Sequence, residues 1–343
     1  MAENNKPAPA HWIDHFVVGT NDLNAWVDWA ENTIGVNQRR FGGLTTKARQ
    51  VNREVNCFMF IGDGSCHFGA FLQRVELPPS KGLARGLPRY GFFVRPEDID
   101  EHLSRLKKLK VPHKGPARIR EYGEEGTIIY FEDPDGNQFE FWAPDRMPEG
   151  AMDVATPLKV GRISSAVFGA RELQRAGEFF SRYFSLSPVS GGHIPEDTLT
   201  LPLAGGAHIV YKLIDNVDDR TIGHRPWFAL HTALMVPDAD FFPNYRIMWA
   251  GLPEWEDAEH KLDVTIEEEN DLRPRTGLHT SPVGRKWKEL HKRGEEFYDW
   301  DTHAFHLVGG VSNRSDGSLA TYVPKEPGDK LKELVGDFGE RPT

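Results

Sequence analysis

The stretch Ile128-Ile-Tyr-Phe-Glu-Asp-Pro-Asp-Gly-Asn-Gln-Phe-Glu-Phe-Trp142 carries the most specific structural signal in this chain of 343 residues. Its two apolar runs are typical of β-strands, and the Asp-Pro-Asp-Gly between them favours a tight turn. The return strand carries one inward carboxylate, Glu140. A buried carboxylate costs several kcal/mol unless it is paired or binds a metal, so Glu140 is a candidate metal ligand.

An internal repeat extends outward from this stretch. Ile13-Asp-His-Phe-Val-Val-Gly-Thr-Asn-Asp-Leu23 and Ile163-Ser-Ser-Ala-Val-Phe-Gly-Ala-Arg-Glu-Leu173 keep Ile, Val, Gly and Leu at the same offsets, 150 residues apart. Each segment predicts a strand followed by an amphipathic helix. In the first copy, Thr20 or Asn21 is expected to cap the helix, and Gly35 is expected to end it.

The order of elements after these helices repeats as well. The first half has a predicted hairpin over residues 57–72 and then a strand, 89–94, that leads into a helix starting at Pro96. The second half has a hairpin over 197–212 and a strand over 228–236. Each half therefore predicts two successive units of one strand, one helix and three strands, which is an α+β fold with tandem βαβββ units.

Composition divides the chain further and excludes some classes of function. We expect a disordered leader (1–10), an N-terminal module (11–145), a linker (146–160), a C-terminal module (161–324) with a polar insertion (250–300), and a charged tail (325–343). The insertion contains scattered tryptophans and is expected to cover an active site or to join two subunits in a homodimer.

Hydrophobic residues make up 39% and charged residues 27% of the chain, which is ordinary for a globular protein. The net charge of −10 and the scattered basic residues argue against a nucleic-acid partner. No apolar run approaches the ~18 residues of a membrane span, and the leader lacks signal-peptide features, so we expect a cytoplasmic protein. Cys57 and Cys66 are then expected to be free buried thiols.

Together with Asp14-His15-Phe16-Val17, the 128–142 stretch resembles the vicinal oxygen chelate superfamily of glyoxalases, bleomycin-resistance proteins and extradiol dioxygenases. The resemblance covers nearly all of residues 10–145 and, more weakly, 160–236 and 303–324. It implies paired βαβββ units that curl a sheet around a divalent metal. In that family the metal ligands come from the first, fourth, fifth and eighth strands of a module.

Carried over by position, the resemblance implies His15, His67 and Glu140 as metal ligands. Two histidines and one carboxylate suit a divalent ion, Fe(II) first and Mn, Zn, Ni or Co as alternatives, and they leave positions open for substrate and O2. Arg89 falls on the fifth-strand position, where the family usually has a histidine. Because Arg89 stays charged it cannot bind a metal, and it is instead a candidate clamp for a substrate oxygen.

The second module lacks a complete ligand set and is interpreted as degenerate. Ser165 stands at its first-strand position, and Ala320 or Thr321 at its eighth. His208 and His231 fall at its fourth- and fifth-strand positions, and His303 and His306 lie ahead of its last hairpin. A site of four histidines is the less favoured interpretation.

The pairing of the modules affects which residues meet. An exchange of units would put His15 and His67 opposite His231 and leave the carboxylate position empty. The unexchanged arrangement is expected, because only that arrangement adds a charged ligand, the carboxylate of Glu140, to His15 and His67.

Ordinary structural roles are open for each of these residues. His15 could be a hydrogen-bonded core histidine, and a register shift of one residue would turn His67 to the other face of its sheet. Arg89 could be a structural ion-pair partner. His11 lies at the fraying end of the strand and is expected to be exposed.

The leading functional hypothesis is a metal-dependent, extradiol-type dioxygenase that opens the ring of a catecholic substrate with O2. Its pocket is expected to include Phe92, Phe139, Trp142 and His208. His231 is a candidate proton-transfer group if the two modules share a cavity. One alternative is a glyoxalase-like isomerase, lyase or epimerase that acts on a carbonyl substrate through an enediolate. Another is a binding protein of the bleomycin-resistance kind that holds an aromatic ligand without catalysis.

Overall fold

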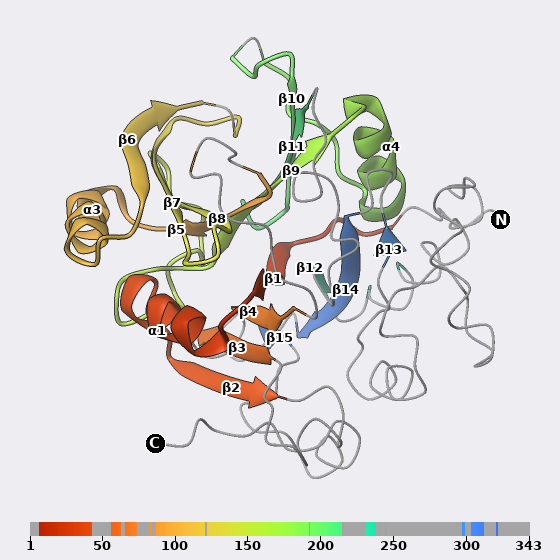
Figure 1. The fold of residues 1–343 in the computed structure, drawn as a ribbon. Coiled ribbons are helices and arrows are strands. Elements are labelled where there is room, and N and C mark those ends of the chain that lie inside the picture. The colour runs from red at the N-terminus through yellow and green to blue at the C-terminus, as the bar shows by residue number, and fades with distance from the viewer. Residues whose placement is uncertain are drawn as a thin grey trace, which may run out of the picture.

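The computed structural model contains two mixed β-sheets, and each sheet takes strands from both halves of the chain (Figure 1). It describes residues 7–42, 56–62, 66–73, 83, 87–120, 122–191, 193–214, 231–237, 240, 244, 297–298, 303–311 and 320–321. The predicted tail and nearly all of the predicted insertion lie outside these residues. Within the described part of the chain, every helix is too short or too polar to cross a membrane.

Four units follow one another along the chain. The first consists of β1 (Trp12–Thr20), α1 (Leu23–Thr33), β2 (Gln38–Gly42), β3 (Asn56–Ile61) and β4 (Cys66–Leu72). The second consists of β5 (Arg89–Phe93), the 3-10 helix η1 (Pro96–Asp98), α3 (Ile99–Lys108), β6 (His113–Ile119), β7 (Gly126–Glu132) and β8 (Gln138–Pro144). The third consists of β9 (Ile163–Ala170), α4 (Leu173–Phe184), β10 (Thr198–Pro202) and β11 (His208–Leu213). The fourth contains β12 (Thr232–Pro237), β13 (Phe297–Tyr298), β14 (Ala304–Val311) and β15 (Ala320–Thr321). The predicted α+β class is confirmed.

The units exchange partners between the halves. Sheet A has the order β13-β14-β12-β1-β4-β3-β2, with β15 paired to β14, and sheet B has the order β10-β11-β9-β5-β8-β7-β6. At the centre of sheet A, β1 pairs with β12 of the fourth unit, and in sheet B β5 pairs with β9 of the third. The expected unexchanged arrangement is therefore wrong. Both arrangements bury the same strand faces, so the alternation of apolar residues does not distinguish them.

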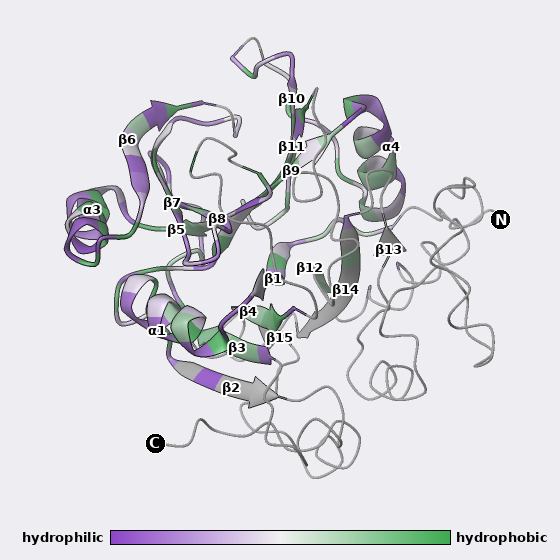
Figure 2. Cartoon of the chain, in the orientation of Figure 1, coloured by the Kyte–Doolittle hydropathy of each residue, from purple (hydrophilic) through white to green (hydrophobic). Residues whose placement is uncertain are grey.

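Helix α1 shows why the repeated segments fold as predicted. Asp22, rather than Thr20 or Asn21, caps it, because its side chain accepts hydrogen bonds from the backbone of Asn24 and Ala25. The helix ends before Gly35, whose φ of +76° lies in the left-handed region that glycine favours. In the equivalent helix α4, hydrophobic and hydrophilic residues lie on different sides (Figure 2), which matches its predicted apolar face.

An aromatic core lies between α1 and the two sheets. Phe16 of β1 stacks on Tyr90 of β5 with ring centroids 4.0 Å apart. Phe92 and Phe139 pack against Phe16 in the same core and are fully buried. Burying one such side chain stabilises the fold by about 1.5–3 kcal/mol, so this layer holds sheet A against sheet B.

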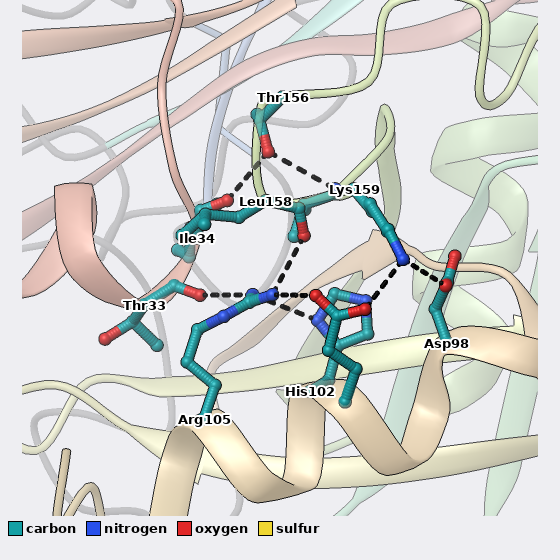
Figure 3. A network of polar contacts seen from close by, with 10 residues as sticks. Thr33, Ile34, Asp98, His102, Arg105, Thr156, Leu158 and Lys159 are labelled. Atoms are coloured by element: carbon teal, nitrogen blue, oxygen red, sulfur yellow. Dashed lines mark hydrogen bonds and ion pairs between the residues drawn. The ribbon is translucent and has the colours of Figure 1, made fainter. Parts of the chain in front are cut away.

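Hydrogen bonds join the predicted linker to α3 and to Ile34 at the end of α1 (Figure 3). Arg105 of α3 donates hydrogen bonds to the carbonyl oxygens of Thr33, at 3.4 Å, and Leu158, at 3.2 Å. Lys159 pairs with Glu101 at 2.7 Å on the exposed side. The segment around residues 156–159 is therefore part of the packed structure.

Two smaller expectations are also tested by the structure. Residues 7–10 of the expected disordered leader pack against the body, since Ala8 exchanges two backbone hydrogen bonds with the Asn244 side chain and Ala10 is fully buried. Cys57 and Cys66 are buried and form no disulfide, as predicted.

Candidate metal centre

His15 and His67 lie side by side on neighbouring strands of sheet A. The parallel pairing of β1 with β4 places them in register, and their rings stack with centroids 4.2 Å apart and planes 23° from parallel. Both side chains are buried. Since Phe16 faces the aromatic core, the alternation of side chains along β1 turns His15 to the opposite face of the sheet. The register predicted from the sequence for His67 is the observed one.

Asp14 joins the two histidines through a β-bulge. In the pairing of β1 with β12, Ile13 and His15 find partners and the register shifts between them, which leaves Asp14 as the extra residue. Its Oδ2 lies 2.5 Å from Nδ1 of His15 and 3.9 Å from Nδ1 of His67. Strict alternation predicts that Asp14 faces the other side of the sheet, so the sequence analysis did not include it.

His231 completes the group from the other half of the chain. It lies just before β12, where its carbonyl accepts a hydrogen bond from the backbone of Val17, and its Nε2 lies 3.1 Å from Nε2 of His15. His231 therefore faces the metal-ligand candidates directly. The exchanged pairing of β1 with β12 brings it there.

The chemistry of this donor set fits a divalent ion. Asp14, His15 and His67 each offer a ligand atom within 4.8 Å of the other two, and all three are buried. An ionised carboxylate only accepts hydrogen bonds, so Asp14 favours the tautomer of His15 that carries its proton on Nδ1 and leaves a lone pair on Nε2. Nε2 of His15 and Nε2 of His231 lie 3.1 Å apart, so both nitrogens could bind the same ion. We call Asp14, His15, His67 and His231 the histidine cluster.

Glu140 lies in sheet B, away from the histidine cluster. Its Oε2 accepts a hydrogen bond from Nε of Arg89, and its Oε1 accepts from the Tyr122 hydroxyl at 2.6 Å and from the Ser165 hydroxyl at 2.5 Å. Glu140 is fully buried, and Arg89 nearly so. The structure thus does not bring Glu140 to His15 and His67, and it gives Arg89 an ion-pair partner.

His208 belongs to the same region of sheet B. The parallel pairing of β11 with β9 places it in register with Ser165, and its ring stacks on Tyr122 at 5.5 Å. Burial lowers the pKa of His208 to about 4, so its ring is neutral near pH 7. Tyr122 and His208 line a pocket of about 570 Å³. We call Arg89, Glu140, Ser165 and His208 the sheet-B cluster.

Register also corrects the residue expected at the eighth-strand position of the second module. In sheet B, β5 pairs in parallel with β8 and places Gly91 opposite Glu140. In sheet A, β12 pairs in parallel with β14 and places Ala233 opposite His306. His306 therefore occupies the backbone position equivalent to Glu140, and the assignment of Ala320 or Thr321 is wrong. The side chain of His306 lies outside the described residues.

The residues expected to line the pocket lie in two regions, the aromatic core and the surroundings of Tyr122. Phe92 and Phe139 belong to the aromatic core and face neither cluster, because they lie on the face of their strands that packs under α1. Trp142 is fully buried and its ring lies 5.2 Å from that of Tyr122. His11, expected to be exposed, is half-buried, and its pKa is lowered by burial and by Arg162.

A separate apolar patch lies beside the histidine cluster. Val17 and Phe71 are buried together, with Phe58 packed against them. Phe58 and Phe60 contact the ring of His67, with centroids 5.5 and 5.1 Å away. These four residues, which we call the apolar wall, lie on the face of sheet A that bears His15 and His67. Counting by twos from those histidines would have predicted them.

Comparison with known proteins agrees with this fold. Residues 12–141 match the model of the Glyoxalase/Bleomycin resistance protein/Dioxygenase superfamily, which confirms the predicted resemblance for this part of the chain. A solved structure of a candidate dioxygenase from Bacillus subtilis is similar, with 14% identity, a TM-score of 0.58, and 88% of this chain and 85% of that chain covered. Glyoxalase I from Zea mays is similar with 14% identity, a TM-score of 0.51, and 87% and 92% covered. At these identities the likeness shows the fold alone. No curated protein matches the chain.

Proposed function

We propose that the protein is a metal-dependent enzyme whose ion is held by the histidine cluster and whose substrate is a small molecule with two adjacent oxygens. The observation that carries this proposal is the approach of His231 to His15 across the exchanged pairing, with Asp14 and His67 on the other side of His15. Imidazole nitrogen suits Fe, Mn, Zn, Ni and Co alike, with Fe(II) as the leading candidate. When bound, the ion would chelate the two substrate oxygens and, in the leading reaction, activate O2.

The side chains around the cluster support an aromatic substrate. Phe58, Phe60 and Phe71 give the apolar wall flat surfaces next to His67. Gly69, between His67 and Phe71, leaves space for Phe58, because a Cβ atom there would lie 2.8 Å from that ring. Aromatic side chains of this kind would favour stacking with a catecholic ring, and their burial would exclude water from the reacting oxygens. Ring cleavage of the extradiol type is therefore the leading reaction.

The residues of the chain divide the remaining work. Asp14 would hold the His15 ring in one orientation and tautomer, which raises the basicity of its Nε2. His231 would present its Nε2 to the ion from the side of the His15 ring that lies opposite Asp14. The backbone of His306 lies at the register position that Glu140 occupies in sheet B. An all-imidazole set carries no charge of its own, so Asp14 would supply the compensating negative charge through His15.

The test is anaerobic loading of the purified chain with Fe(II), followed by addition of O2 and a panel of catechols. We expect oxygen uptake with the appearance of a coloured ring-fission product. His15→Ala should abolish turnover, while His113→Ala, a change in β6 of sheet B, should leave it intact. A chain that binds no ion but retains an aromatic ligand in the presence of a chelator would instead support the binding-protein alternative.

A second candidate reaction keeps the site and omits O2. In this reaction His15 and His67 would hold the ion, and His231, whose Nε2 lies 3.1 Å from Nε2 of His15, would accept a proton from a substrate carbon next to a carbonyl. This favours isomerase or epimerase chemistry through an enediolate. Turnover of a 2-hydroxy or 2-oxo carbonyl compound without oxygen consumption would support this reaction, and oxygen uptake in step with product would exclude it.

A further inference from the structure

The two clusters occupy equivalent places in two equivalent sheets. β1 pairs in parallel with β4 and matches His15 to His67, whereas β9 pairs in parallel with β11 and matches Ser165 to His208. Both first strands carry a bulge one residue earlier, at Asp14 in β1 and between Ile163 and Ser165 in β9. The sheet-B cluster is therefore a second copy of the site with different side chains.

Arg89 stands at the place of His231 in this second copy. His231 precedes Ala233 by two residues, and Arg89 precedes Gly91 by two residues, while Ala233 and Gly91 lie at equivalent positions opposite His15 and Ser165. The guanidinium therefore enters the sheet-B cluster from the strand that supplies an imidazole in the histidine cluster.

The hydrogen bonds of Glu140 leave little capacity for an ion. Both oxygens accept, from the Arg89 Nε, the Tyr122 hydroxyl and the Ser165 hydroxyl. Burial would lower the pKa of Arg89, but the charge of Glu140, with Tyr122 and Tyr130, more than offsets it, so the guanidinium stays charged. Burial and Glu140 raise the pKa of Tyr122, so its hydroxyl keeps the proton that it donates.

Packing and donor grouping agree with these contacts. A Cβ atom on Gly91 would lie 2.1 Å from the Ser165 hydroxyl and 2.8 Å from Cγ of Glu140, so the cluster fills its space closely. Among the described residues, Asp14, His15 and His67 group closely enough to hold an ion, whereas Glu140 and His208 belong to no such group.

We propose that the guanidinium of Arg89 takes the place of a divalent ion in the sheet-B cluster, so that this second copy of the site needs no metal. This inference rests on the proposed function, because the histidine cluster is the metal site with which the sheet-B cluster is compared. The cation is covalently part of the chain. It neutralises Glu140 permanently, where a metal would do so only when bound.

The experiment counts Co(II) ions bound per chain by equilibrium dialysis and elemental analysis, and follows the visible absorption of bound Co(II). The double variant His15→Ala, His67→Ala removes the first site and provides the background. We expect this background to bind no ion tightly. Adding Arg89→His and Ser165→His to it should create one site, since His208 and Glu140 are already in place, and a further Glu140→Gln should weaken that site at least tenfold.

Two results would overturn the proposal. One is an ion that the background variant still binds and that Glu140→Gln removes, because this would place a natural metal site at Glu140. The other is a failure of the added histidines to recruit an ion although circular dichroism shows a folded chain. Arg89→His alone is the milder variant if the double change does not fold. If the natural chain bound no ion, the proposed function would fail, yet the gain of a site in sheet B would still be measurable.

Discussion

Oδ2 of Asp14 lies 2.5 Å from Nδ1 of His15. The two residues are consecutive in β1, and their side chains share a face because the strand is bulged there. An ionised Asp14 favours the proton of His15 on Nδ1, which leaves the lone pair on Nε2, and Nε2 faces His231 at 3.1 Å. The bulge therefore sets the direction of the central residue of the histidine cluster. Bulges often re-aim side chains at active sites.

Asp14→Asn should weaken metal binding by about 10–100-fold, as the loss of a partner behind a ligating histidine does. The amide keeps the size of the carboxylate but loses the charge and leaves the His15 tautomer unspecified. Competition against a chelator with a coloured metal complex gives the affinity. Asp135→Asn, in the β7–β8 turn, is the matched control. Equal affinities for the Asp14 variant and the natural chain would show that Asp14 has no role behind His15.

His231→Ala and His208→Ala should separate the two sheets. Loss of His231 removes a nitrogen that lies 3.1 Å from His15, so we expect metal affinity to fall by at least 100-fold. Loss of His208 leaves the histidine cluster untouched, so the ion should stay bound. Elemental analysis after dialysis measures both. The opposite pattern, with the ion lost from the His208 variant, would move the metal centre to sheet B.

Arg89→Met should destabilise the fold by about 3–5 kcal/mol, because it leaves the buried Glu140 carboxylate without its cation. The double variant Arg89→Met, Glu140→Gln should recover part of this loss, since glutamine is uncharged and still accepts from Tyr122 and Ser165. Urea unfolding gives both values. Arg118→Met, which breaks the exposed pair with Asp145, is the control and should leave the unfolding midpoint unchanged. A double variant no more stable than Arg89→Met would argue against a charge-driven effect.

Acid should destabilise the protein partly through His208. Burial lowers its pKa from 6.5 to about 4, so below pH 6.5 the unfolded chain binds the proton more readily than the folded one. The stabilisation is complete above pH 6.5 and is lost as the pH falls through 4, for a total of up to about 3 kcal/mol. His208→Asn should therefore flatten the pH dependence of the free energy of unfolding over this range. Parallel curves for the variant and the natural chain would contradict the buried neutral ring.

Arg105→Ala should cost about 1–3 kcal/mol, because Arg105 donates to the carbonyl oxygens of Thr33 and Leu158 and so joins α1 to the linker. Lys159→Ala removes only exposed ion pairs with Asp98 and Glu101 and should have little effect. Thermal unfolding compares the two. Equal losses would mean that the linker is held through its surface charges.

The sequence was sufficient for the order of elements, because hydrophobic periodicity and turn residues are local signals. The stretch around Glu140 and the repeat around Ile13 and Ile163 predicted strands and helices that the structure contains. His15 and His67 were also expected on one face of a sheet, and their pairing in register places them there.

The sequence was insufficient where several strands had to be placed at once. Asp14 was missed because a bulge breaks strict alternation, and no residue type at that point signals one. Glu140 was wrongly grouped with His15 and His67. The exchange of units depends on which strand edges pair, and these edges look alike in sequence. His306 was passed over because the long segment between β12 and β14 hides their parallel register.

The exchange of partners also has a consequence for biosynthesis. β1 emerges first from the ribosome, but its central neighbour β12 is encoded more than 200 residues later. Sheet A cannot close until most of the polypeptide has been translated, and such non-local pairing slows folding and leaves strand edges open to wrong neighbours. A nascent first half, lacking both of its later partners, would expose edges suited to pairing with another nascent chain.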